Sequence, residues 1–213
     1  MDKNIKWVNE KRAGRVIDSL QKNNMNGYLV KSREELIEKI EEIVKEGSLV
    51  GCGGSMTLFE TGVMDHLRSG RYEFLDRYKE GLVQEDVKKI YRATFSADAY
   101  FSSTNAITEQ GELYNVDGNG NRVAAMLYGP DKVIVVAGIN KIVKNVEEAI
   151  ERNKNIAAPA NAKRLNKETP CAKVGYCMDC QSDERICCEY TLIRKQNRRD
   201  RIYVIFINEE MGY

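Results

Sequence analysis

The sequence predicts an α/β protein in which helices and strands form layers around a mainly parallel sheet. Segments with a helical spacing of apolar residues alternate along the chain with short apolar segments, as expected of such layers. The segment "KVIVVAG" (132–138) is apolar almost throughout, which is typical of a strand buried on both faces of a parallel sheet. A length of 213 residues allows a sizeable core, so we expect a single domain over residues 1–213.

Apolar periodicity and turn residues predict the elements in order. We expect helices at residues 4–24, 32–45, 55–70, 85–97 and 140–155. We expect strands at residues 27–30, 48–50, 72–76, 98–104 and 132–138, and a final strand with a tail over residues 201–213. Ser32 and Glu35 form a capping box for the second helix, and Gly47 stops it. Residues 105–121 carry hairpin signals, with turns at Gln110-Gly111 and Asp117-Gly118.

Composition and charge exclude several classes of protein. The formal net charge is +1, which argues against nucleic acid and anionic membranes as partners. No stretch approaches the roughly 18 apolar residues of a membrane span, and the charged start "MDKNIKWVNEKR" lacks the apolar centre of a signal peptide, so we expect a cytoplasmic protein. His66 is the one histidine, so a metal site with several histidine ligands cannot form within one chain. The basic run from Arg194 to Arg201 is expected to be a solvated turn between the last two strands.

A glycine-rich turn follows the predicted strand at 48–50. Bare amides at such a turn can bind a phosphate or a carboxylate beyond the carboxyl end of a strand. Ser55 is placed to cap the next helix, and its neighbours in the turn and in the first helical turn are Gly51, Gly53, Gly54 and Thr57. The turn matches neither a P-loop nor the dinucleotide fingerprint. A tight turn without a ligand is the alternative, and Cys52 is expected to be a small core residue.

Other polar loops follow neighbouring strands and should reach the same edge of a parallel sheet. They carry few acids, two cations and many neutral donors, a mixture that suits a small anionic ligand with hydroxyl groups. Glu109 is the acid–base candidate among them. Plain solvated turns are the alternative interpretation. The candidate binding residues are Ser102, Ser103, Asn105, Thr108, Asp117, Asn119, Asn121, Arg122, Asn140 and Lys141.

Five of the six cysteines lie between Cys171 and Cys188. Cys177 and Cys180 form a C-x-x-C pair that can bind one metal, and Cys171 with either Cys187 or Cys188 would complete four ligands. Zinc and an iron–sulfur cluster both suit four thiolates, and the spacing does not choose between them. Free thiols in a polar loop, or a C-x-x-C redox pair, are the alternatives.

Three segments together resemble the lactate-utilisation (LUD) domain family. They are "GCGGSMTLFETGVMDHLRSG", "FSSTNAITEQGELYNVDGNGNRVAAMLYGPDKVIVVAGINKIV" and "TPCAKVGYCMDCQSDERIC", and the likeness spans nearly the whole chain. The resemblance implies a Rossmann-like three-layer sandwich of the glucosamine-6-phosphate deaminase, ribose-5-phosphate isomerase and CoA-transferase group, with a cysteine-rich loop near its end. It also implies a link to oxidation of lactate to pyruvate, with iron–sulfur lactate-utilisation proteins as partners. Glu109 is similar to the nucleophilic acid of CoA-transferases.

The sequence therefore supports a LUD-domain protein that binds a small anionic metabolite in 2-hydroxy-acid utilisation. In this hypothesis Gly53, Gly54 and Ser55 hold the anion, and the polar residues of the other loops orient it. Two alternatives remain open: a non-catalytic accessory protein that depends on a metal or redox centre, and an enzyme like a sugar-phosphate isomerase or a formyltetrahydrofolate cyclo-ligase. The sequence is compatible with a homo-oligomer. Catalysis by the chain alone and catalysis with partner proteins are both compatible with it.

Overall fold

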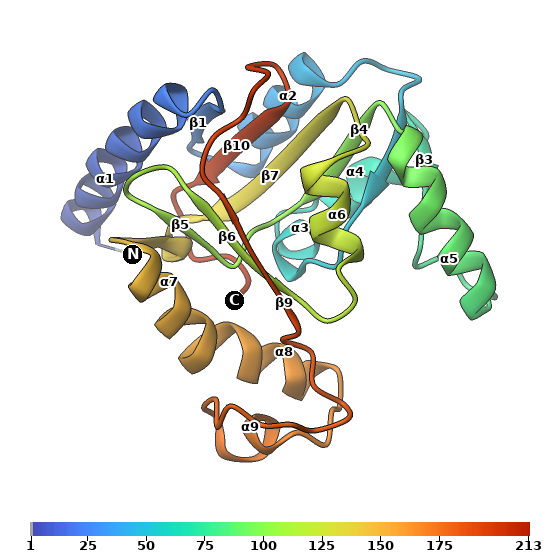
Figure 1. The fold of residues 1–213 in the computed structure, drawn as a ribbon. Coiled ribbons are helices and arrows are strands. Elements are labelled where there is room, and N and C mark those ends of the chain that lie inside the picture. Colours follow the sequence, from blue (N-terminus) through green and yellow to red (C-terminus); the bar gives the residue numbers. More distant parts are fainter. Residues whose placement is uncertain (1) are drawn as a thin grey trace.

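A computed structural model describes residues 2–213 and has a six-stranded sheet at its centre (Figure 1). Every neighbouring pair in this sheet is parallel, which confirms the predicted fold class. The strands in spatial order are β1 (Asn26–Val30), β10 (Ile202–Ile207), β7 (Lys132–Gly138), β4 (Ala99–Ser102), β2 (Leu49–Cys52) and β3 (Glu73–Leu75).

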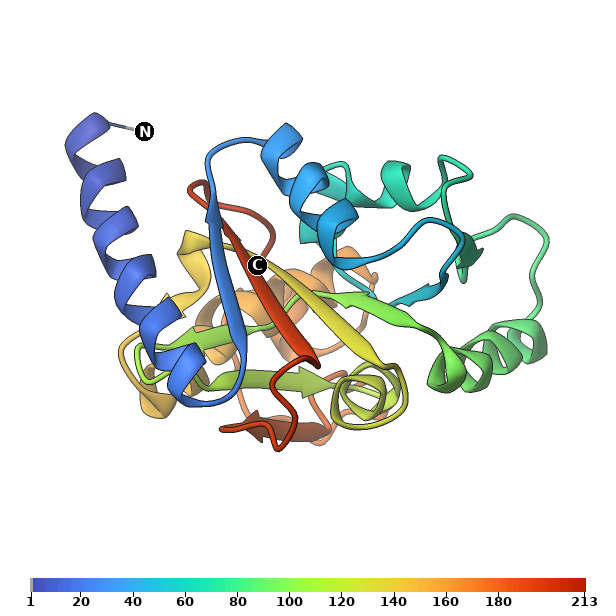
Figure 2. The same cartoon turned by 90° about the horizontal axis from the view of Figure 1, so that it is seen from above.

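Helices cover both faces of the central sheet, because successive side chains of each strand point to opposite faces. In β7, Val133 and Val135 pack on one face, while Ile134 and Val136 pack on the other. One face is covered by α2 (Arg33–Ile43), α3 (Met56–Glu60) and α4 (Val63–Leu67). The opposite face is covered by α1 (Lys3–Lys22), α6 (Asn121–Leu127) and a smaller sheet, so the molecule is layered (Figure 2).

The smaller sheet has the order β8-β5-β6-β9. Its strands are β5 (Ala106–Thr108), β6 (Leu113–Asp117), β8 (Ile142–Val143) and β9 (Glu189–Ile193). β5 and β6 form the antiparallel hairpin that the turn at Gln110-Gly111 predicts. α7 (Val146–Arg152) packs on the outer face of this sheet through Ala149 and Ile150.

The remaining helices lie at the periphery. α5 (Gln84–Ala93) follows β3 and carries no fully buried residue. A π-helical segment (Asn153–Ala157) joins α7 to α8 (Ala158–Arg164), and the chain then enters α9 (Pro170–Val174) and the cysteine-rich segment. α9 and this segment project from the body beyond α8 (Figure 1). None of the described helices combines the length and the apolar character needed to cross a bilayer.

Three predicted elements differ from the structure. The helix expected to run to Gly70 is broken at Gly62, whose φ of 78° is left-handed, so α3 and α4 are separate. The turn at Asp117-Gly118 leads into α6, which the sequence pattern did not predict. The helix expected from residue 140 begins only at Val146, because Ile142 and Val143 pair with β5.

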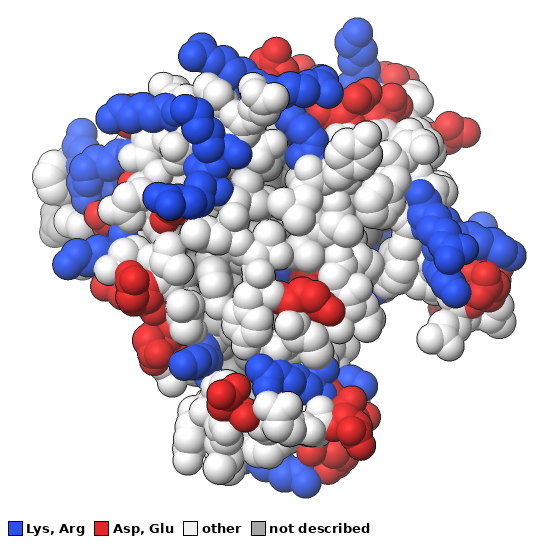
Figure 3. Space-filling view, in the orientation of Figure 1, with Lys and Arg blue, Asp and Glu red and all other residues white. Residues whose placement is uncertain are grey.

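The basic loop between β9 and β10 is exposed, as predicted, apart from Arg201. Lys and Arg side chains gather near the top of the surface in Figure 3, over this loop, while both signs of charge mix around α9. Arg201 is 8% exposed and donates hydrogen bonds to the backbone oxygens of Met126 and Ala125, at the end of α6. It therefore ties α6 to the start of β10 and neutralises part of the negative end of that helix.

Replacement of Phe101, which is fully buried in β4, tests the core between the sheet and α4. We expect Phe101→Ala to lower the free energy of unfolding by about 3–5 kcal/mol, because it leaves a cavity where the ring packs. Phe95→Ala is the control, since Phe95 is 38% exposed and should lose only about 1 kcal/mol. Urea unfolding followed by circular dichroism measures both, and equal losses would contradict this account of the core.

Candidate functional site

A cavity of about 280 Å³ opens at the carboxyl edge of the central sheet. Loops that follow parallel strands contribute its walls: Gly54 and Ser55 after β2, Arg77 and Tyr78 after β3, residues 103–105 after β4, and Lys141 after β7. The other sides of the cavity are lined by Asn161 and Arg164 of α8, by the loop at 118–121 and by Tyr213. This is the edge at which parallel α/β sheets bind their ligands.

The structure brings many of the predicted binding residues together in this cavity. Those that line it are Gly54, Ser55, Ser103, Asn105, Asp117, Asn119, Asn121, Arg122 and Lys141. Those that do not line it are Gly51, Gly53, Thr57, Ser102, Thr108, Glu109 and Asn140.

The glycines of the turn have different roles. The Gly53 amide donates to the backbone oxygen of Phe101 at 2.9 Å, so it belongs to the sheet and does not point into a ligand. A Cβ on Gly53 would lie 2.9 Å from Cγ of Arg122, and one on Gly51 would lie 2.7 Å from Oγ1 of Thr94. Both glycines therefore permit close packing, and only Gly54 faces the cavity.

Ser55 caps α3 as predicted, accepting a hydrogen bond from the Leu58 amide at 3.3 Å. Because α3 has only five residues and Ser55 already accepts one of its first free amides, the N-terminus of α3 contributes less positive potential to the cavity than the sequence suggested. The side chains around the cavity supply it instead.

Glu109 lies away from the cavity, at the turn of the β5–β6 hairpin. Its carboxylate accepts a hydrogen bond from Nε of Arg12 at 2.8 Å, which ties the hairpin to α1. Thr108 stays in the same turn, where its hydroxyl bonds to the Glu112 carboxylate and accepts from the Glu112 amide. The expectation that Glu109 and Thr108 face the ligand is not met, because β5 leads them away from the carboxyl edge of the central sheet.

Thr57 and Asn140 hold the segment that ends at Tyr213. Asn140 donates to the backbone oxygen of Gly212 and accepts from the Met211 amide, both at 3.1 Å. The Thr57 hydroxyl donates to the backbone oxygen of Met211 at 3.4 Å. These residues act on the cavity indirectly, because they hold Tyr213 in its wall.

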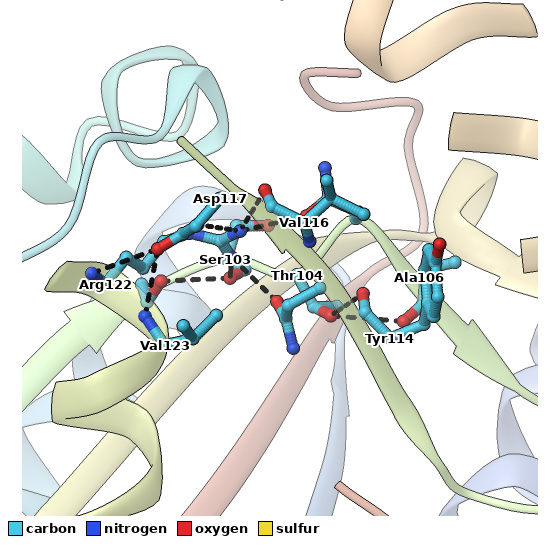
Figure 4. A network of polar contacts seen from close by, with 11 residues as sticks. Ser103, Thr104, Ala106, Tyr114, Val116, Asp117, Arg122 and Val123 are labelled. Atoms are coloured by element: carbon cyan, nitrogen blue, oxygen red, sulfur yellow. Dashed lines mark hydrogen bonds and ion pairs between the residues drawn. The ribbon is translucent and has the colours of Figure 1, made fainter. Parts of the chain in front are cut away.

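Arg122 is a structural residue in spite of its place at the cavity (Figure 4). Its Nε donates to Asp117 at 2.8 Å, and its four terminal N–H groups donate to the Asn115 and Asn105 side-chain oxygens and the backbone oxygens of Ser103 and Val116. All five donors are thus used within the protein. The other carboxylate oxygen of Asp117 accepts the backbone amides at the start of α6.

Lys141 is the cavity residue with the most unusual environment. Its side chain is buried, and Nζ donates to Oγ of Ser103 at 3.0 Å and to the backbone oxygen of Tyr213 at 3.3 Å. Burial, together with the nearby charges of Arg152 and Arg122, lowers the pKa of Lys141 to about 7 against the opposing effect of Glu60. The amine can therefore exchange a proton near neutral pH.

Arg77 and Arg164 were not predicted. The Arg77 guanidinium lies over the rings of Tyr78 and Tyr91, at 5.0 and 4.9 Å, and its buried Nε makes no hydrogen bond within the described chain. Arg164 donates to the side-chain oxygen of Asn161. Within residues 2–213 neither arginine forms an ion pair with a carboxylate, so both charges remain available to an anion in the cavity.

Three of the cysteines in the cysteine-rich segment lie near one another. Cys187 is buried, burial raises its pKa, and it lies close enough to Cys177 and Cys180 to be affected by their charges. The Asp179 amide donates to Sγ of Cys177 at 3.3 Å, within the C-x-x-C turn. Over the described residues, no three His, Cys, Asp or Glu side chains stand in metal-binding positions, so the arrangement as it stands does not fit a four-thiolate site. That site stays a prediction from the sequence.

Cys52 is a core thiol, as expected. It packs between the sheet and the helices of one face, and burial raises its pKa to about 12. A thiol with this pKa remains protonated at neutral pH and is a poor nucleophile.

Loss of Arg122 should destabilise the fold strongly. Arg122→Ala leaves the buried Asp117 carboxylate without its cation and removes a donor from several other acceptors, and we expect the free energy of unfolding to fall by about 3–5 kcal/mol. Arg122→Lys keeps the charge but not the planar set of donors, so its loss should be smaller. Denaturant unfolding measures both, and a neutral Arg122→Ala variant would contradict the structural role.

The lowered pKa of Lys141 makes stability depend on pH. Lys141 has a pKa of about 7 in the folded chain and the ordinary lysine pKa of 10.5 when unfolded, so between these values the unfolded chain binds more protons. The free energy of unfolding of the wild type should therefore rise with pH across this window, relative to Lys141→Met, at about 1.4 kcal/mol for each pH unit. Urea titrations of both proteins from pH 6 to 10 measure the difference, and a constant difference would contradict a buried, titrating amine.

Comparisons with known proteins agree with this architecture. The model of the LUD domain matches residues 13–207. A crystal structure of a DUF162 family protein from Deinococcus radiodurans is similar with a TM-score of 0.51 and 15% identity, covering 93% of this chain and 98% of that one; the likeness shows the fold alone. No curated protein matches. The chain thus belongs to the LUD domain family, which is associated with lactate utilisation.

Proposed function

We propose that this LUD domain binds a small organic anion in the cavity at the carboxyl edge of its sheet, in support of 2-hydroxy-acid utilisation. The observation that carries the proposal is the charge of the cavity wall. Arg77, Lys141 and Arg164 line the same cavity, and the one acid on its wall, Asp117, is already paired with Arg122. A carboxylate or phosphate would neutralise cations that form no ion pair with an Asp or Glu side chain of the described chain.

The size and polarity of the cavity narrow the ligand to a small metabolite. Its volume of about 280 Å³ lies just below the roughly 300–1,000 Å³ range of ligand pockets. Ser103, Thr104 and Asn105 add hydroxyl and amide groups on one side, which suits a ligand that carries a hydroxyl or carbonyl beside its acid group. Lactate and related 2-hydroxy acids have this pattern.

Oxidation of a 2-hydroxy acid to a 2-oxo acid releases two electrons and two protons. We propose that iron–sulfur partner proteins accept the electrons, while this chain holds and orients the acid. The alternatives, a sugar phosphate, a CoA ester or a folate, enter the test as competing ligands.

Removal of either unpaired arginine should weaken anion binding. We expect Arg77→Gln and Arg164→Gln each to raise the dissociation constant about tenfold or more, since a charge-assisted hydrogen bond contributes about 1.5–3 kcal/mol. Thermal shift followed by isothermal titration, with lactate, pyruvate, ribose 5-phosphate, CoA and folate, measures the effect and identifies the class of ligand. Binding should also weaken with added salt.

Arg15→Gln is the matched control, because Arg15 is exposed on α1 and does not line the cavity. It should leave the dissociation constant unchanged. The proposal is wrong if no anion stabilises the wild type, or if the control variant loses as much affinity as the two cavity variants.

A further inference from the structure

The Lys141 amine differs from the other buried cations of the described chain. Arg122 is paired with Asp117, while Arg152 and Arg201 donate to backbone oxygens. Lys141 is 3% exposed, and its Nζ has only a hydroxyl and a backbone oxygen as partners. A buried amine on a cavity wall that forms no ion pair with an Asp or Glu side chain of the described chain has the features of a nucleophile.

We propose that Lys141 forms an imine with the carbonyl group of a small 2-oxo acid bound in the cavity. The inference rests on the proposed function and deepens it, since it names the substrate class and a covalent step at the same site. A 2-oxo acid carries its carboxylate next to the carbonyl carbon, so Arg77 and Arg164 can hold the charge while the carbonyl meets Nζ.

The step balances without a cofactor. The lone pair of neutral Nζ attacks the carbonyl carbon, one proton passes from Nζ to the former carbonyl oxygen, and a neutral carbinolamine forms. Its hydroxyl group takes up one further proton and leaves as water, while the nitrogen lone pair forms the C=N bond of the iminium ion. The Ser103 hydroxyl, which already accepts a hydrogen bond from Nζ, is placed to move the proton.

Charged groups around the amine keep part of it neutral. Arg152 of α7 and Arg122 of α6 oppose protonation of Nζ, and Glu60 of α3 favours it, with burial as the largest effect. With a pKa of about 7, a large share of Lys141 is the free amine at neutral pH, whereas exposed lysines, with pKa values near 10.4, are almost fully protonated.

Reductive trapping tests the step on the unaltered protein. The full chain is incubated with pyruvate and sodium borohydride, and intact mass followed by peptide mapping locates the product. We expect one reduced adduct, on Lys141, because borohydride delivers hydride to the iminium carbon. Lactate, which lacks the carbonyl, should bind without an adduct. The trapping rate should rise with pH through about 7 and then level off.

Variants separate covalent capture from simple charge attraction. Lys141→Arg keeps a positive charge but lacks the nucleophilic amine, so it should lose trapping, and calorimetry with lactate measures its anion binding separately. Lys141→Met removes both charge and amine without adding a polar group to a buried position, so circular dichroism checks its fold. Lys163→Arg, at an exposed lysine of α8, is the control and should trap as the wild type does.

The outcomes distinguish the two proposals. Pyruvate that binds by calorimetry but leaves no adduct on Lys141 overturns the imine and leaves anion binding intact. The imine proposal is also wrong if adducts form on many exposed lysines, or if the trapping rate still rises between pH 9 and 10. If no anion binds, both proposals are wrong. If the adduct forms on Lys141 in the wild type and also in Lys163→Arg, both proposals are supported.

Discussion

The Arg122 guanidinium holds together the parts from which the cavity is built. From α6, its five donors reach the loop after β4 and the strand β6, so one side chain joins three elements. A buried guanidinium is tolerated only where each donor has a partner, so the geometry of these loops is tightly specified. Gly53 belongs to the same arrangement, because a side chain there would displace Arg122. The cavity walls are thus fixed before any ligand arrives.

That arrangement leaves an uneven distribution of charge. The Asp117 carboxylate on the cavity wall is paired with Arg122, while Arg77 and Arg164 keep their charges and Lys141 donates to the Ser103 hydroxyl and to the oxygen of Tyr213. Burial penalises the ammonium form of Lys141, and that penalty is a cost in stability that the fold tolerates at this position. Destabilised groups of this kind concentrate at functional sites.

The sequence allowed the fold and part of the site to be predicted, for reasons that particular residues make clear. Parallel strands place their carboxyl ends at one edge, so Gly54, Ser103 and Lys141 were found from strand position alone. The same rule would have found Arg77, which follows β3 closely. It failed for Glu109, because β5 turns away into a second sheet, a pairing that depends on tertiary contacts. Arg164 lines the cavity because the π-helical segment directs the chain into α8, and no local sequence pattern predicts that direction.

The position of β10 affects the way the molecule is assembled. β10 is the last strand of the described chain, yet it lies between β1 and β7 and supplies hydrogen bonds to both. A chain emerging from a ribosome therefore presents two open strand edges until residues 202–207 follow, and pairing at those edges with other nascent chains is a hazard during that interval. Only when β10 has docked can the residues after it reach Asn140 and Thr57, so the ligand pocket is among the last features of the molecule to form.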